Sequence, residues 1–251
     1  MVKYPTLYWT PCAAHCINLM FKDIGEMNKV QTLVSNAKMI TNFIYNHSWV
    51  LALMRKYTKG DLVRPAATRF ATNYIALDSI QKRKEGLVKS FTSNEWFSSR
   101  YATTEIGKTI QDLITSTKFW ERIYRFTKIM QPLFVILKVV DGDKAQTMGN
   151  IVHCMEVVKQ KIEEENPKSF KAFLKIINRR WENNLVQDLH RAAYYLNPDL
   201  HYKNNLRFRK DLMESLKDVI NKLAPNIDSA KDAIEEVSSL LNLHIESLIN
   251  I

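Results

Sequence analysis

Cysteine and histidine side chains near the start of the chain, Cys12, His15 and Cys16, are of the types that bind zinc or act as nucleophiles. His153 and Cys154 offer the same chemistry later in the sequence. Adjacent residues on a helix point to different faces, so this pair is poorly spaced to complete a tetrahedral site. Nothing identifies an orienting third group for a nucleophile either. We therefore expect no metal site, and cysteines that are free.

Two groups of acidic residues are also candidates for catalysis or metal binding. Asp141 and Asp143 flank Gly142, where their side chains are expected to hydrogen-bond the backbone of their own turn. Glu163, Glu164 and Glu165 precede Pro167 and are expected to form a solvated helix face. The sequence contains no glycine-rich phosphate loop, no paired-cysteine motif and no helix with two spaced histidines. It therefore predicts no active site and no cofactor within this chain.

A group of basic and aromatic residues around Pro65 is the strongest binding signal. Basic side chains contact phosphates and aromatic rings can stack on exposed bases, which suits distorted or single-stranded nucleic acid. The aromatic residues Phe70 and Tyr74 are equally well explained as core residues. The candidate DNA-binding residues are Arg55, Lys56, Lys59, Arg64, Arg69 and Phe70.

Composition and charge distribution narrow the class of protein. The chain has 251 residues, 46% of them hydrophobic, and a formal net charge of +10. Residues 29–89 hold 11 Lys and Arg against three acids, a local +8, whereas residues 228–251 have a local −4. A basic balance favours polyanion partners, although the same side chains also serve simply to solvate helix faces. With three cysteines, no run resembling a membrane span and no signal-peptide pattern, we expect the cytosol or nucleus and no membrane.

The hydrophobic pattern predicts a mainly α protein. Apolar residues recur every three or four positions, and only six Gly and seven Pro interrupt them. Thr6 to Trp9, between two prolines, are expected to form one short strand whose partner lies elsewhere. Ser48 is expected to cap a helix, and Pro132 to kink one. The expected helices cover residues 30–46, 49–57, 74–91, 119–137, 148–162, 170–189, 206–223 and 228–248.

Several ordered blocks of sequence resemble the hAT superfamily of transposases, specifically the plant hAT-like proteins. The first block is Tyr8-Trp9-Thr10-Pro11-Cys12-Ala13-Ala14-His15-Cys16-Ile17-Asn18-Leu19-Met20. The later blocks are Lys22-Asp23-Ile24-Gly25, Ile40-Thr41-Asn42-Phe43-Ile44-Tyr45-Asn46-His47, Arg64-Pro65-Ala66-Ala67-Thr68-Arg69-Phe70-Ala71-Thr72, Phe119-Trp120, Val139-Val140-Asp141-Gly142-Asp143, Arg180-Trp181 and Leu189-His190-Arg191-Ala192-Ala193-Tyr194-Tyr195-Leu196-Asn197-Pro198. Their order and rough spacing cover nearly the whole chain.

The resemblance implies a ribonuclease H-like catalytic fold that is interrupted by an all-helical insertion. Residues 1–26 would be the last strand before the insertion with its following helix, and residues 27–251 the insertion domain, incomplete at its C-terminus. Three carboxylates that hold divalent metal, such as Mg²⁺, for cut-and-paste DNA transposition would lie outside this chain. Cys12 and His15 match the family's Cys-x-x-His, which is expected to support that active site rather than bind zinc. Phe70 stands where many relatives have Trp. Phe at this position keeps a surface for stacking but lacks the indole N–H donor.

These observations predict a nuclear, transposase-derived DNA-binding fragment that is catalytically incompetent alone, with transposon ends as its DNA partner. The alternative is a domesticated nuclear helical protein-interaction module. Its C-terminal helix carries apolar residues to the end of the chain, and would bind a protein partner or a second copy.

Overall fold

The described part of the chain is helical. In the computed structural model the residues that can be described are 4–64, 71–142, 147–165 and 170–249. Within these ranges the chain forms fourteen α-helices, one π-helical turn and one 3₁₀ turn, and no strand. The prediction of a mainly α protein is confirmed.

The first eight helices are α1 (Ala13–Gly25), α2 (Asn28–Asn46), α3 (Ser48–Thr58), α4 (Thr72–Lys82), α5 (Lys84–Phe91), α6 (Asn94–Phe97), α7 (Glu105–Thr115) and α8 (Thr117–Val140). The second half contains α9 (Met148–Glu165), α10 (Phe170–Arg180), the π turn (Trp181–Leu185), α11 (Asp188–Leu196), α12 (Pro198–Lys203), the 3₁₀ turn (Leu206–Phe208), α13 (Lys210–Leu223) and α14 (Ile227–Ile249).

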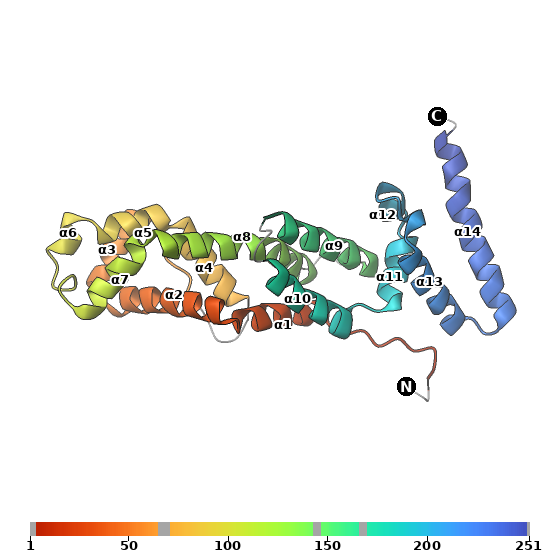
Figure 1. The fold of residues 1–251 in the computed structure, drawn as a ribbon, viewed down its shortest axis with the longest axis horizontal. Helices are drawn as coiled ribbons and strands as arrows, with labels where there is room; N and C mark the ends of the chain where they lie inside the picture. The colour runs from red at the N-terminus through yellow and green to blue at the C-terminus, as the bar shows by residue number, and fades with distance from the viewer. Residues whose placement is uncertain (1–3, 65–70, 143–146, 166–169, 250–251) are drawn as a thin grey trace.

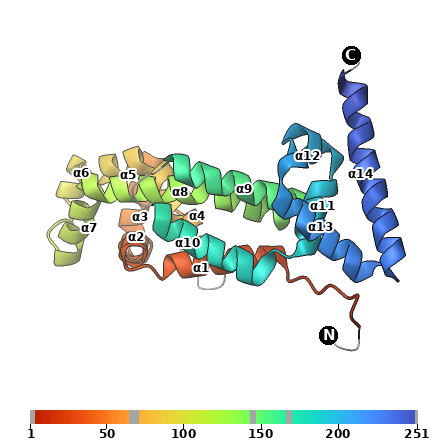
Figure 2. The ribbon, with the colours of Figure 1, turned by 45° about the vertical axis from the view of Figure 1, so that its right-hand side comes forward.

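The helices form an elongated body (Figure 1). α3, α5, α6 and α7 lie at one end, and α11, α12 and α13 lie at the other. α8 runs along the body between the two ends and packs against α1, α2, α4, α7 and α9. α14 packs on α13 and stands apart from the rest, as the turned view in Figure 2 also shows.

Apolar stripes with helical spacing explain why these helices pack as they do. The stripe of α2 is buried, with Val30, Ala37 and Ile44 each less than a tenth exposed. In α8, the longest α-helix, Ile123 and Leu133 are fully buried. Side-chain caps fix several helix starts, for example at Ser93, Thr104, Ser116 and Asn197.

The short strand expected at Thr6 to Trp9 is wrong. This segment begins in a turn, in which the Leu7 N–H donates to the Tyr4 carbonyl at 3.2 Å, and it pairs with no strand, because no neighbouring strand exists among the described residues to share its hydrogen bonds. It lies against the second half of the chain instead. Gln187 Nε2 donates to the Trp9 carbonyl at 2.8 Å, and the Lys222 ammonium lies 3.7 Å from the centre of the Tyr8 ring.

Three expected helix boundaries also need correction. Ser48 is the first residue of α3 and makes no cap, since His47 occupies the N-cap position. The stripe from Tyr74 to Phe91 is divided at Arg83 into α4 and α5. The helix expected over residues 170–189 ends in the π turn, after which Val186 and Gln187 are extended and α11 begins. Continuing apolar periodicity concealed these breaks, and the kink at Pro132 stays a prediction.

Candidate nucleic-acid interface

The loop from Lys59 to Arg64 leads out of α3 and is pinned to its surroundings. Lys59 ends the helix in the left-handed conformation with φ 53°, and its N–H donates to the Arg55 carbonyl. Thr58 Oγ1 donates to the Gly60 carbonyl at 2.7 Å, and the Val63 N–H donates to Ser79 Oγ of α4 at 3.0 Å. The loop therefore holds its basic residues in a defined place.

Two of the predicted DNA-binding cations are neutralised by carboxylates. Arg55 donates from Nε and Nη2 to Asp61 at 2.6 and 3.0 Å, and this hydrogen bonding holds the pKa of Asp61 below its ordinary value. Lys56 forms an ion pair with Glu95 of α6, which lowers the pKa of Glu95. Both pairs are exposed to solvent. Each cation is therefore less available to a phosphate than its residue type suggests.

The other two described cations remain open to a ligand. Lys59 is exposed. Arg64 is also exposed, and its guanidinium lies 4.8 Å from the centre of the Tyr45 ring, within cation–π distance. These two residues form the accessible part of the predicted site.

Arg83 joins the same loop and was missed by the sequence prediction. Its guanidinium Nη1 donates to Ser79 Oγ at 3.2 Å, and its Nη2 would lie 3.3 Å from a Cβ placed on Gly60. The signal was present in the run Lys82-Arg83-Lys84, but only the fold brings its middle member against the loop. Lys59, Arg64 and Arg83 together are called the basic loop cluster below.

Arg69 and Phe70 lie outside the described residues. Tyr74, which follows them on α4, belongs to the core: it is 4% exposed and packs on Phe134 with ring centres 4.6 Å apart. Burial raises its pKa to about 12. Tyr74 is therefore not a surface for stacking bases.

Cys12 and His15, the family-motif residues, lie at the start of α1. Both are exposed, and Cys12 occupies the N-cap position without a side-chain cap. His15 lines a groove of about 540 Å³ together with Ala71, Phe134 and Lys138. The fold thus places His15 in the same groove as Ala71, the residue that directly follows Phe70. The structure does not test the supporting role expected for the Cys-x-x-His motif.

Burial makes two of the three thiols, Cys16 and Cys154, harder to ionise. Cys16 is buried, its Sγ lies 3.6 Å from the Asn184 carbonyl, and burial raises the pKa of its thiol. Burial also raises the pKa of the Cys154 thiol. Among the residues that the structure describes, no three His, Cys, Asp or Glu side chains converge as a metal site.

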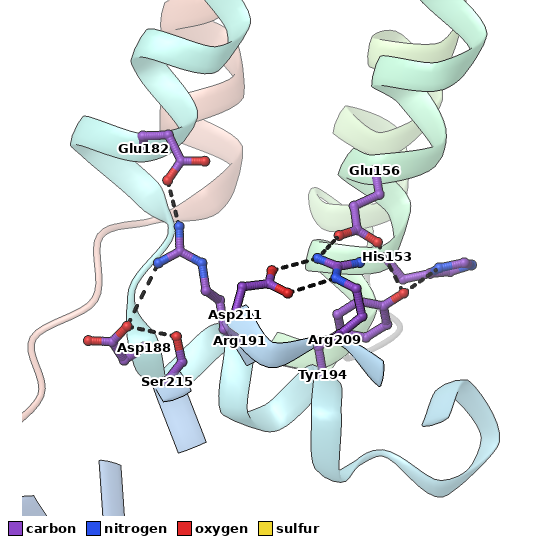
Figure 3. Close-up of polar contacts among 9 residues, drawn as sticks. All are labelled: His153, Glu156, Glu182, Asp188, Arg191, Tyr194, Arg209, Asp211 and Ser215. Carbon is purple, nitrogen blue, oxygen red and sulfur yellow. Dashed lines mark hydrogen bonds and ion pairs between the residues drawn. The ribbon is translucent and has the colours of Figure 1, made fainter. Parts of the chain in front are cut away.

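Carboxylates of the second half are held by arginines in a polar network (Figure 3). Arg209 donates to Glu156 of α9 and to Asp211 of α13, each at 2.8 Å. These bonds, with the nearby carboxylates, raise the pKa of Arg209. Glu156 also accepts a hydrogen bond at 3.1 Å from Tyr194 Oη of α11. The network links three helices.

A second branch of the network extends toward the π turn (Figure 3). Arg191 of α11 pairs with Glu182 and lies 3.7 Å from Asp188. Asp188 accepts a hydrogen bond from Ser215 Oγ of α13 at 2.9 Å. Each acid in Figure 3 thus already has a partner within the chain.

Comparison with known proteins gives one match. A family described as "Domain of unknown function (DUF659)" matches residues 1–40, the segment that contains Cys12 and His15. This family is found in hAT-like plant transposase-related proteins. No curated protein and no solved structure matches the chain. Within the described ranges no helix has the length and apolar character that crossing a membrane requires.

Proposed function

We propose that this chain is a DNA-binding helical fragment of a hAT-like, transposase-related protein, and that it acts in the nucleus. The DUF659 match over residues 1–40 supports the relationship at its N-terminal end. The resemblance of the later blocks extends the proposal to the helical insertion that would position transposon-end DNA.

The basic loop cluster is the observation that carries this proposal. Lys59 and Arg64 come from the loop after α3 and Arg83 from the α4–α5 junction, and Asp61 is an acid of the same loop. In sequence, Lys59 and Arg64 precede and Arg83 follows the segment in which Arg69 and Phe70 are expected to contact DNA. A loop and a helix junction that bring basic residues toward each other suit contact with a phosphate backbone.

The fragment has no strand-cleaving activity of its own in this proposal. Two-metal phosphoryl transfer needs carboxylates that converge and are free to bind cations. The neighbouring acids of Figure 3 are hydrogen-bonded to arginines, which supports a structural role for them. Catalytic carboxylates and Mg²⁺ would belong to other parts of a full-length enzyme.

The test is fluorescence anisotropy of labelled duplex and hairpin DNA over a salt series. Reversing the basic loop cluster with Lys59→Glu, Arg64→Glu and Arg83→Glu should weaken binding to every sequence. It should also reduce the slope of log K against log salt by about 3, because each phosphate contact contributes about 0.9. A matched control reverses Lys171, Lys175 and Lys217, which are exposed in the second half. Equal losses in both triple variants, or no binding by the folded wild type at low salt, would reject the proposal.

A second candidate function is protein interaction through the C-terminal helices. Leu223 and Ile227, at the turn between α13 and α14, are 50% and 75% exposed, an unusual position for large apolar residues on adjacent elements. Sedimentation over a range of concentrations, with Leu223→Asp and Ile227→Asp, distinguishes this function. The protein-interaction function would be favoured if the wild-type chain self-associates and does not bind DNA, and if these changes abolish the self-association.

A further inference from the structure

A small polar cavity lies between α9, α11 and the segment from Asn204 to Arg209. Its volume is about 370 Å³, at the lower end of the range for ligand pockets. Its polar lining residues are His153, Glu156, Gln160, Tyr194, Asn204, Asn205 and Arg209. We call it the α9–α11 pocket. Its one acid and its one arginine are already paired with each other, so the pocket is suited to a neutral ligand.

The pocket adjoins a longer grooved face. His153 and Val157 of α9 also line a groove of about 690 Å³ between α8 and α9, whose rim carries Lys128 and Lys161. Lys128 in turn borders a depression of about 460 Å³ between α4 and α8. A polynucleotide held over these lysines by its phosphates would have the pocket beside it.

The hydrogen bonds around Tyr194 fix which polar atoms face a ligand. Tyr194 is 1% exposed, and its hydroxyl has a single proton, which it donates to the Glu156 carboxylate at 3.1 Å. The same oxygen lies 3.3 Å from His153 Nδ1, so it accepts a hydrogen bond from an N–H at that nitrogen (Figure 3). Neutral His153 therefore carries its proton on Nδ1, and its Nε2 is an acceptor.

The amide side chains of the pocket add further acceptors. Asn204 Nδ2 donates to the Leu200 carbonyl at 2.9 Å, and Gln160 Nε2 donates to Glu164 at 2.9 Å. Each amide keeps its carbonyl oxygen and its second N–H for a ligand. Asn205 holds the left-handed conformation, with φ 52°, at the edge of the pocket. The pocket therefore offers both acceptors and donors of hydrogen bonds.

Phe208 supplies a flat apolar surface beside these acceptors. Its side chain is 67% exposed although it lines the pocket. The Arg207 guanidinium lies 4.4 Å from the ring centre and belongs to the neighbouring groove between α13 and α14. Stacking on an exposed aromatic ring is the usual way in which proteins hold an unpaired base.

We propose that the α9–α11 pocket binds one unpaired nucleobase, stacked on Phe208, from a DNA strand that crosses the α8–α9 face. Every nucleobase carries hydrogen-bonding groups at its edge, which complement the imidazole and amide groups of the pocket. A base outside its helix can be read by hydrogen bonds at its edge together with stacking. This inference rests on the proposed function, since it supposes a bound polynucleotide.

The test uses hairpins with identical stems that are fully paired or carry one bulged adenine, cytosine, thymine or abasic site, measured by fluorescence anisotropy. The wild type should bind the adenine, cytosine and thymine bulges about tenfold more tightly than the abasic bulge and the fully paired hairpin. Phe208→Ala should abolish this preference and leave binding to the paired hairpin unchanged, and Phe208→Trp should retain the preference. Phe97→Ala, which removes a phenylalanine that is 55% exposed on α6, is the matched control and should retain it too.

The outcomes separate this inference from the proposed function. Equal binding of all hairpins would overturn the pocket while leaving the basic loop cluster in place. Loss of the preference in both Phe208→Ala and Phe97→Ala would overturn it as well. Free adenosine monophosphate tests whether the pocket is instead a mononucleotide site. Saturable binding of this nucleotide that depends on Phe208, without any preference among the hairpins, would overturn the proposal. Absence of all hairpin binding at low salt would reject the proposed function and the inference together.

Discussion

The two ends of the elongated body are stabilised by different interactions. At one end, which we call the aromatic end, α2, α3, α5, α6 and α7 enclose a cluster of rings. Trp96 is fully buried, with its ring centre 4.5 Å from that of Phe91 and 6.2 Å from that of Phe43. Its indole N–H donates to Gln111 at 2.9 Å, which satisfies the one polar atom of the ring.

The opposite end, the network end, joins α9, α11 and α13 through the ion pairs of Figure 3. Arg209 and Glu156 are partly buried, with side chains 39% and 37% exposed, and Tyr194 beneath them is buried. Apolar packing responds little to salt or to pH, whereas ion pairs weaken in salt and when a partner loses its charge. Stability at the two ends should therefore depend differently on solution conditions, while α8 connects them.

The largest effect is expected from Trp96→Ala at the aromatic end. Removing a fully buried indole should lower the free energy of unfolding by about 3–5 kcal/mol, because a cavity replaces its contacts. Urea unfolding followed by circular dichroism measures this loss, which should be the same at low and high salt. Phe97→Ala, at the exposed neighbouring position, is the control and should change little. Similar losses in the two variants would contradict an aromatic core.

A smaller loss is expected from Asp23→Asn, which breaks the link between α1 and α10. Asp23 is 9% exposed and accepts hydrogen bonds from Arg180 at 2.7 and 2.8 Å and from Arg179 at 2.6 Å. Both arginines reach solvent, so the expected loss in unfolding free energy is about 1–3 kcal/mol, below that of a fully buried pair.

The pH dependence of Asp23→Asn has a definite sign. Hydrogen bonding from Arg180 lowers the pKa of Asp23, so its stabilisation is complete above the ordinary value of about 3.9. It is lost as the pH falls through the lowered folded-state pKa. The difference between wild type and Asp23→Asn should therefore narrow below about pH 4. Urea unfolding over that range measures it, with exposed Asp112→Asn as the control; a constant difference would refute the assignment.

The sequence predicted helices well because helix burial follows a local rule. Val30, Ala37 and Ile44 lie seven positions apart along α2, which is about two helical turns, and this spacing alone places them on one face. Breaks such as Val186 and Gln187 escaped prediction because the apolar pattern continues across them. Gln187 in this break makes a contact far away in sequence, since its side chain donates to the Trp9 carbonyl, and no local pattern predicts such a contact.

The sequence indicates which residue types gather at the candidate site, but not which of its cations are paired with carboxylates. Arg55, Lys56, Lys59 and Arg64 lie on α3 and the loop that follows it, but the pairing of Lys56 with Glu95 joins residues 39 positions apart. Arg83 joined the loop for the same reason, since the α4–α5 turn folds back on Gly60. Tertiary position decides which cations remain open to DNA, and local patterns do not carry that information.

At the network end, Tyr194→Phe should lower the free energy of unfolding by about 1 kcal/mol. The substitution keeps the buried ring and removes one hydroxyl, so Glu156 and His153 each lose a hydrogen bond, while Glu156 keeps its pair with Arg209. Tyr124→Phe, at a tyrosine that is 52% exposed, is the matched control and should have no measurable effect. If both variants behave like wild type in urea, the network does not stabilise this end.

The smallest effect on stability is expected at the exposed Lys56–Glu95 pair of the aromatic end. The two side chains are 60% and 43% exposed, so Glu95→Gln should leave the urea midpoint unchanged. The same change releases the Lys56 charge, so binding to duplex DNA should strengthen and its salt slope should steepen by about 1. Lys56→Gln should keep the same stability without this gain. A marked loss of stability in Glu95→Gln would mean that ion pairs hold both ends. If stability is unchanged and DNA binding is stronger, apolar packing stabilises this end. The surface ion pairs then determine how much positive charge a ligand encounters.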